Sequence, residues 1–254
     1  MARDDTPVLI FDLDGTILRV NSFPFWVLYM IAGPLPELGW RARLTLSAKA
    51  QKLLLRRKLG RIDHRQLMGG IQAAWHEATG AGRDEPADRV SRLLRHLVRP
   101  ALEPLLDRIG AGEADAVLAT AAAGEYAIGL GHQLGFRHVL STPCRLPPDE
   151  AINAGQQKLS RVLVFLAAQD WTERPAVLLT DHLDDLPLMR HVGVVVWFGA
   201  AAGMARASAL AAGTKFVDCR RLAEATASPV LAMLSAYPRS PAGAEFGSPD
   251  NTSV

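Results

Sequence analysis

This chain has little of several features that define common protein classes. Only two cysteines, Cys144 and Cys219, occur among 254 residues, and no short spacing joins them. This excludes a disulfide framework or a cysteine-rich metal site and predicts two reduced thiols. The chain begins a strand almost at once, without a signal-peptide pattern, so we expect a cytoplasmic protein. The formal net charge of +2 gives no global sign of a nucleic-acid partner.

Long apolar runs are also missing. The most apolar segment, Phe23–Ala32, has ten residues, whereas a helix that spans a bilayer needs ~20. We therefore expect a buried helix here, with a lipid-facing or lipid-phosphate-binding helix as the alternative.

A basic segment follows this apolar one. Eight cationic residues occur within 22 positions: Arg41, Arg43, Lys49, Lys52, Arg56, Arg57, Lys58 and Arg61. The favoured interpretation is a solvated helix face, and the alternative is a helix that lies peripherally on an anionic membrane. Nucleic acid is not expected, because stacking aromatic residues are not interleaved with these charges and no binding motif is present.

The most informative segment that is present is Asp12-Leu13-Asp14-Gly15-Thr16. It follows the apolar run Val8–Phe11, which predicts a buried parallel strand. Ligands of open α/β sheets bind beyond the carboxyl ends of such strands. Two carboxylates on a tight turn there need a cation or a shared proton. The segment favours a metal site with a carboxylate nucleophile, although an Asx-rich turn is the plain alternative.

Three later positions strengthen this hypothesis. Thr120 ends the apolar run Ala116–Ala119 and precedes a helical pattern, which suits a phosphate oxygen or a simple helix N-cap. Lys158 stands directly before the helical segment 159–168. A lysine near the N-terminus of a helix is usually a solvated surface charge.

The third position is the segment after the apolar run Ala176–Leu179. Asp181 and Asp185 are four residues apart, so both can face one crevice. We expect Asp184 to cap the next helix or to face solvent.

The order of these four motifs resembles that of the haloacid dehalogenase-like superfamily, and Asp181–Met189 is similar to its phosphoserine-phosphatase-like branch. The resemblance covers about Val8 to Phe198. It implies an α/β fold with a Rossmann-like parallel sheet core and an inserted all-helical cap domain. It also implies that the three strands before the motifs are neighbours at the centre of the sheet.

The expected domains follow from this resemblance. Residues 1–18 and 101–237 would form the core and residues 19–100 the cap, with helices at 41–59, 62–79 and 87–98. Further short strands are expected at 136–140, 193–197 and 215–218. The composition of residues 238–254, rich in Pro, Gly and Ser, predicts a disordered tail.

The resemblance also implies roles for single residues. Asp12 would be the nucleophile, Asp14 the general acid and base, and Lys158 the balancing charge. Thr120 and Ala121 would bind phosphoryl oxygens. The expected Mg²⁺ ligands are Asp12, the backbone carbonyl of Asp14, and Asp181, with Asp185 in support through water or Lys158. Independently, four converging carboxylates beside one lysine would leave a net charge of −3, which calls for an oxygen-binding cation such as Mg²⁺.

The expected function is a Mg²⁺-dependent phosphatase that acts on a small phosphomonoester through an aspartyl-phosphate. Asp14 favours phosphoryl transfer, because the true dehalogenases lack this second aspartate. A phosphomutase or phosphotransferase with the same chemistry and a membrane-associated or partner-binding module remain alternatives.

Two positions depart from the phosphoserine phosphatases. Arg19 stands in the stretch where those enzymes carry an acid that binds the substrate amine, which argues against phosphoserine and makes Arg19 a candidate for a second anionic group. Ala122 replaces a hydroxyl residue that is common in this branch.

Overall fold

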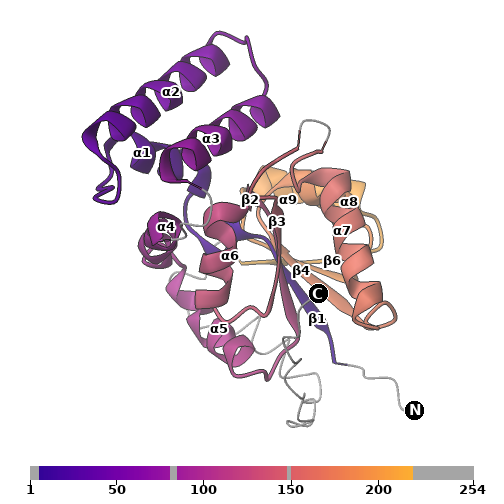
Figure 1. Ribbon diagram of the computed structural model, residues 1–254. Coiled ribbons are helices and arrows are strands. Elements are labelled where there is room, and N and C mark those ends of the chain that lie inside the picture. Colours follow the sequence, from indigo (N-terminus) through magenta and orange to yellow (C-terminus); the bar gives the residue numbers. More distant parts are fainter. Residues whose placement is uncertain (1–5, 81–84, 148–149, 220–254) are drawn as a thin grey trace.

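A computed structural model of the protein describes residues 6–80, 85–147 and 150–219. Its core is a six-stranded parallel sheet with the strand order β3-β2-β1-β4-β5-β6 (Figure 1). The strands are β1 (Val8–Phe11), β2 (Ala116–Ala123), β3 (His138–Thr142), β4 (Ala176–Thr180), β5 (Val194–Trp197) and β6 (Lys215–Asp218). The three strands that precede the carboxylate and threonine motifs are adjacent at the centre, as expected.

The two apolar faces of β1 explain its unbroken hydrophobic sequence. Leu9 and Phe11 belong to one buried cluster, and Val8 and Ile10 belong to another on the opposite face of the sheet. Successive side chains of a strand point to opposite faces, so a strand covered on both sides needs apolar residues at every position.

Helices cover both faces of this sheet (Figure 1). On one side lie α5 (Glu103–Gly110) and α6 (Gly124–Gln133), and on the other lie α7 (Gly155–Ala168), α8 (Leu186–Met189) and α9 (Ala201–Leu210). The fold is therefore the expected Rossmann-like α/β core.

The chain between β1 and β2 is helical throughout its described regular structure. It forms α1 (Ser22–Ala32), α2 (Trp40–Lys58), α3 (His64–Thr79) and α4 (Glu85–Arg95). Asn21 caps α1, and a reciprocal capping box of Asp63 and Gln66 begins α3. Helices α1, α2 and α3 pack together as the inserted cap (Figure 1).

Helix α4 differs from the other three insertion helices because it packs mainly against α6 of the core. The hydroxyl of Ser91 in α4 donates to the backbone oxygen of Tyr126 in α6 at 2.8 Å. The insertion begins and ends at one paired junction, where Leu18 forms an antiparallel bridge with Val98. The domain boundaries that we expect, 18/19 and 100/101, lie at this junction and stay a prediction.

Three further observations concern the expectations from composition. Neither Cys144 nor Cys219, both described, forms a disulfide bond. Every helix in the described residues is too short or too polar to cross a membrane. The predicted disordered tail, residues 238–254, lies outside the described residues.

Candidate active site

A cavity of about 360 Å³ lies at the carboxyl ends of β1, β2 and β4, between the sheet and the cap. From the core it is lined by the motif residues Asp12, Asp14, Gly15, Thr120, Ala121, Lys158, Asp181 and Asp185. The cap side consists of Arg19, Val20, Asn21, Phe23, His64 and Met68. Every residue that the sequence placed in the site therefore borders one cavity.

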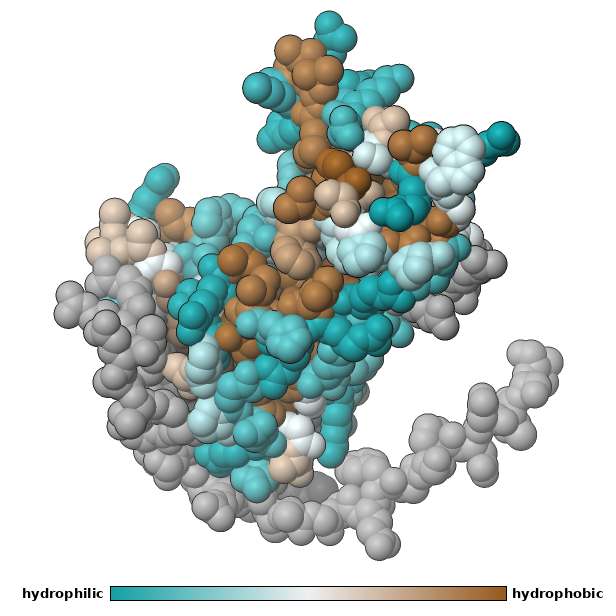
Figure 2. All heavy atoms as spheres, turned by 90° about the vertical axis from the view of Figure 1, so that its left-hand side faces the viewer, coloured by the Kyte–Doolittle hydropathy of each residue, from teal (hydrophilic) through white to brown (hydrophobic). Residues whose placement is uncertain are grey.

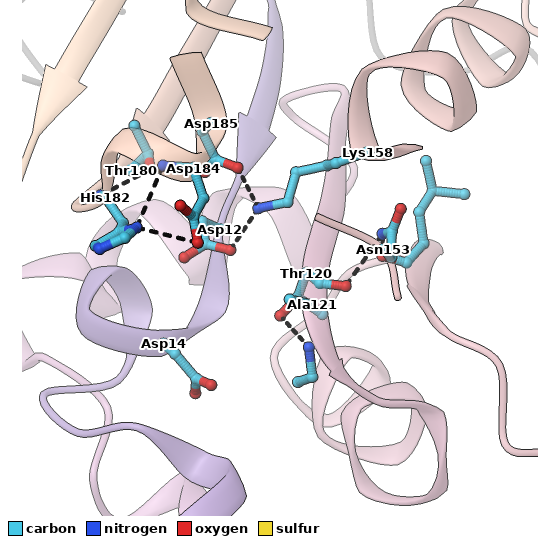
Figure 3. Close-up of polar contacts among 12 residues, drawn as sticks. Asp12, Asp14, Thr120, Ala121, Asn153, Lys158, Thr180, His182, Asp184 and Asp185 are labelled. Atoms are coloured by element: carbon cyan, nitrogen blue, oxygen red, sulfur yellow. Dashed lines mark hydrogen bonds and ion pairs between the residues drawn. The ribbon is translucent and has the colours of Figure 1, made fainter. Parts of the chain in front are cut away.

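Lys158 occupies the floor of this cavity between two carboxylates (Figure 3). Its Nζ lies 2.8 Å from Oδ1 of Asp12 and 2.7 Å from Oδ1 of Asp185. All three side chains are buried, and the hydroxyl of Thr180 donates a further bond to Asp185 at 2.7 Å. The interpretation of Lys158 as a solvated surface charge is wrong, because only 3% of this residue is exposed.

The titration of this cluster reflects burial opposed by ion pairing. Burial raises the pKa of Asp12 to about 7, although Lys158 acts to lower it, and the nearby charge of Asp185 adds to the rise. Burial alone would lower the pKa of Lys158, but its two carboxylate partners raise it above its ordinary value. Lys158 is therefore a permanent cation beside Asp12.

Asp14 lies apart from this group (Figure 3), and it is held by Ser22, the first residue of the cap helix α1. Its Oδ1 accepts from the backbone N–H of Ser22 at 2.9 Å, and its Oδ2 accepts from the Ser22 hydroxyl at 3.0 Å. The hydroxyl of Tyr126 in α6 lies 2.8 Å from that of Ser22. Burial raises the pKa of Asp14 to about 6, and the two bonds from Ser22 limit the rise.

Asp181 approaches the turn that carries Asp14. A Cβ at Gly15 would lie 2.0 Å from Oδ2 of Asp181, and Gly15 has a φ of +73°. Both facts require glycine at this position. Burial raises the pKa of Asp181 as well. Asp184 also borders the cavity, but its side chain is largely exposed to solvent, as expected, and pairs with His182.

Thr120 lies within β2 rather than at its end, because the strand continues to Ala123 and α6 begins only at Gly124. The pairing of β2 with β3 is interrupted between Ala119 and Ala123. The Thr120 hydroxyl accepts the N–H of Ala122 at 3.1 Å, so its proton remains for another acceptor. Thr120 does not cap the helix, because the N-cap position belongs to Ala123.

Four residues of the site escaped the sequence analysis. Ser22 and Tyr126 hold Asp14, as described above. The buried side-chain amide of Asn153 donates to the backbone oxygens of Thr120 and Leu140 at 3.0 and 2.7 Å. The guanidinium of Arg99 donates to the backbone oxygens of Thr16 and Gly15 at 2.8 and 2.7 Å. None of the four belongs to a local sequence motif that would have identified it.

The donor set suits a hard cation such as Mg²⁺. Asp12, Asp14 and Asp181 offer only oxygen atoms, and burial raises the pKa of each, which is the condition that a bound cation relieves. Among the described residues, no group of three or more His, Cys, Asp or Glu side chains is placed to hold a metal ion. The expected ligand set uses two carboxylates, from Asp12 and Asp181, with the backbone carbonyl of Asp14.

A larger cavity of about 520 Å³ lies at the opposite, amino ends of β2 and β3, with Asp115, Arg137 and Trp171 in its lining. The conserved geometry of open α/β sheets places ligands at the carboxyl ends. The cavity that contains Asp12 and Lys158 is therefore the candidate site.

The fold and this site define a class of α/β hydrolases with a carboxylate centre and a helical insertion. A sequence model of the haloacid dehalogenase-like hydrolase family matches residues 9–190. The chain belongs to this family. No curated protein sequence matches it significantly.

Solved structures share the fold. A protein of unknown function from Bordetella pertussis Tohama I is 18% identical, with a TM-score of 0.64 over 84% of this chain and 99% of that one. A probable phosphoserine phosphatase from Vibrio cholerae is 17% identical, with a TM-score of 0.58 over 92% of this chain and 66% of that one. A cytosolic 5'-nucleotidase IIIB bound to cytidine is 12% identical, with a TM-score of 0.56 over 91% and 85%. These likenesses extend over most of the chain and show a shared fold.

Proposed function

We propose that this protein is a Mg²⁺-dependent phosphatase that hydrolyses a small phosphomonoester through a phosphorylated Asp12. One observation supports this most: the buried carboxylate of Asp12 lies on the floor of a cavity, with the ammonium of Lys158 at 2.8 Å. A carboxylate nucleophile needs a cation beside it when a negatively charged phosphate approaches.

The proposed reaction consists of two successive displacements at phosphorus. An oxygen of Asp12 attacks phosphorus and the bond to the ester oxygen breaks, while Asp14 in its protonated form gives the leaving oxygen its proton. Asp14 then takes a proton from water as the water oxygen attacks phosphorus and releases Asp12. A pKa of about 6 suits both roles of Asp14 near neutral pH.

The other residues bind and orient the phosphoryl group. Thr120 offers its hydroxyl proton from the irregular part of β2, and Asn153 fixes the backbone there. Lys158 balances charge on Asp12 and on the transferred group. Mg²⁺, held by Asp12, Asp181 and the carbonyl of Asp14, would supply further charge neutralisation for the phosphoryl oxygens.

The cap side of the cavity indicates the class of substrate. Its six lining residues include one cation, Arg19, and no carboxylate. Burial lowers the pKa of His64, so this imidazole is neutral at neutral pH. An ammonium group of a substrate would find no partner on this side. We therefore expect an uncharged or anionic leaving group that contacts Phe23 and Met68, rather than phosphoserine.

The test is Mg²⁺-dependent phosphate release from a panel of phosphomonoesters, compared among the native protein, Asp12→Asn and Asp184→Asn. We expect activity that requires Mg²⁺, vanishes in Asp12→Asn and persists in Asp184→Asn, because the largely exposed Asp184 pairs with His182 while Lys158 pairs with Asp12 and Asp185. Beryllofluoride should bind the native protein in a Mg²⁺-dependent manner and fail to bind Asp12→Asn.

Two results would contradict the proposal. Transfer of phosphate between organic groups without release would favour a mutase. Absence of both turnover and beryllofluoride binding would show that the site is not a phosphoryl-transfer centre.

A further inference from the structure

Helix α2 is the outer helix of the cap, and most of its surface contacts no other part of the described structure. Leu46 and Ala50 are its only buried residues, and they lie on the face that packs against α1 and α3. The cap helices that contribute side chains to the candidate-site cavity are α1, with Phe23, and α3, with His64 and Met68, and no residue of α2 lines it.

The opposite face of α2 carries an apolar stripe. Trp40, Leu44 and Leu55 are 67%, 62% and 56% exposed, and Leu59, just after the helix, is 56% exposed. Residues 40, 44, 48, 55 and 59 are separated by four or seven positions, about one or two helical turns, so they share one side of a helix. Figure 2 shows hydrophobic side chains between hydrophilic ones on the part of the surface that the cap forms. We call these residues, with the exposed Ala48, the α2 stripe.

The charges beside the α2 stripe are all positive. Residues 40–61 contain eight lysines and arginines and no aspartate or glutamate. Within the described part of the chain, Lys49 alone among these eight forms an ion pair, with Glu77 of α3. By helical position, Arg41, Lys52 and Arg56 flank one side of the stripe, and Arg43 and Lys58 flank the other.

We propose that α2 docks this protein on an anionic phospholipid surface, with the helix axis parallel to the bilayer. An apolar stripe with tryptophan and leucine, bordered on both sides by cations, matches the layered chemistry of a bilayer interface. The helix is too polar to cross a membrane, so it lies on the surface.

Charge complementarity decides between this occupant and others. A second copy of the chain would bring two strongly cationic surfaces together. Nucleic acid would leave the leucines of the stripe without an apolar partner. An anionic lipid surface offers negative headgroups to the cations of α2 and an apolar layer to the α2 stripe.

Docking through α2 leaves the catalytic cavity open. The cavity lies between the sheet and the side of the cap that α1 and α3 form. The α2 stripe lies on the face of α2 that points away from α1 and α3. This geometry predicts that hydrolysis of a water-soluble substrate does not depend on the α2 stripe, so membrane binding and catalysis can be tested separately.

The experiment is flotation of the full chain with vesicles of phosphatidylcholine alone or with added phosphatidylserine. The variants are Leu44→Ser with Leu55→Ser, and Lys52→Gln with Arg56→Gln. The matched control is Leu163→Ser with Val164→Ser, which removes two apolar residues that are 41% and 71% exposed on α7 of the core. Circular dichroism verifies that each variant is folded.

We expect the native protein and the α7 control to float only with phosphatidylserine and to be released by high salt. Each α2 variant should lose at least about tenfold in apparent affinity for the vesicles. Interfacial binding depends both on burial of the apolar stripe and on attraction between its flanking cations and the anionic lipid. The fluorescence of Trp40 should shift to the blue on these vesicles, and Trp40→Phe should remove that shift.

Three outcomes would overturn the proposal. They are no binding to phosphatidylserine vesicles, binding that both α2 variants retain, and an equal loss in the α7 control. Vesicle-independent self-association through the stripe, measured by ultracentrifugation, would assign the surface to a second copy instead.

Discussion

At the scale of single residues, the environment of Asp14 decides whether it can act as a general acid. Its carboxylate is removed from water, which raises its pKa to about 6, and Ser22 opposes this rise by donating two hydrogen bonds. The Ser22 hydroxyl is itself fixed by that of Tyr126. The proton of Asp14 is thus controlled by one residue of the cap and one of the core.

Ser22→Ala tests this control. It removes the hydroxyl bond to Asp14 and keeps the backbone bond, so the pKa of Asp14 should rise and the alkaline limit of kcat should move to higher pH. We expect kcat at neutral pH to fall about tenfold from misorientation of the acid. The pH profile of kcat gives the measurement.

Tyr126→Phe is the matched control for Ser22→Ala, because it removes the partner of Ser22 and leaves both bonds to Asp14. Tyr126→Phe should shift the alkaline limit of kcat less than Ser22→Ala does. A profile unchanged in Ser22→Ala would show that Ser22 has only a structural role.

The spacing of Asp12, Asp14 and Asp181 at strand ends predicted these residues from sequence, because each follows an apolar strand within a few positions. Tyr126 could not be predicted in this way. It is 104 residues from Ser22, and their contact exists only because α1 of the cap packs beside α6 of the core. Lys158 was recognisable through the order of motifs and not through its own surroundings.

At the scale of elements, α3 is joined to α6 by a buried polar cluster. Gln72 and His76 of α3 contact the two carboxylate oxygens of Glu125 at 3.0 and 2.9 Å. The Glu125 side chain is only 2% exposed. These bonds cross from the cap to the core beside the catalytic cavity, so they set how closely α3 lies over it.

Glu125→Ala should loosen this contact. Gln72 and His76 would keep the backbone oxygens of Pro143 and Cys144 as partners but lose the carboxylate, and we expect a loss of ~1–3 kcal/mol in the free energy of unfolding. Amide exchange in α3 should rise, since the helix would open more often.

The exposed ion pair between Lys49 of α2 and Glu77 of α3 provides the comparison for Glu125→Ala. Glu77→Ala should cost less than about 1 kcal/mol, as surface ion pairs do. Equal effects of the two substitutions on urea denaturation would contradict a specific joint between α3 and α6.

The elements themselves were largely predictable. The apolar runs at β1 and β4 coincide with observed strands, because a parallel strand covered on both faces tolerates few polar residues, and the run at 215–218 coincides with the edge strand β6. The chain after Thr120 was not predictable, since an alanine run favours helix by propensity, yet Ala121–Ala123 is extended within β2. Strand β3 begins at His138 rather than at Phe136, whose ring packs edge-on against Phe11 at 5.2 Å before the strand starts.

At the scale of the whole molecule, parallel topology brings residues from distant segments to one edge of the sheet. Neither strand order nor cap placement follows from periodicity, which specifies elements and not neighbours. The resemblance to a family supplied that order. The parallel topology concentrates four buried or partly buried carboxylates in one cavity with a single lysine. This arrangement lowers the stability of the fold, and a bound cation would offset that loss.

This cost predicts how Mg²⁺ and pH together affect unfolding. Burial raises the pKa of Asp12 to about 7 and of Asp14 to about 6, so the metal-free fold binds extra protons. The contribution of these groups to stability is greatest below about pH 4 and is lost as pH rises through about 6 to 7. Mg²⁺ at about 100 times its Kd should add about 2.7 kcal/mol near pH 7.5, a rise of ~5–10 °C in Tm. Near pH 5 the rise should be smaller, because Mg²⁺ must displace protons.

Calorimetry of three variants identifies which residues cause the rise in Tm with Mg²⁺. Asp12→Asn and Asp181→Asn should each abolish most of it, because they remove the two carboxylates of the expected ligand set. Asp184→Asn should preserve it, since Asp184 is exposed and pairs with His182. A Mg²⁺ effect that is equal at both pH values, or that persists without Asp181, would place the cation elsewhere on the protein and separate the carboxylate cluster from metal binding.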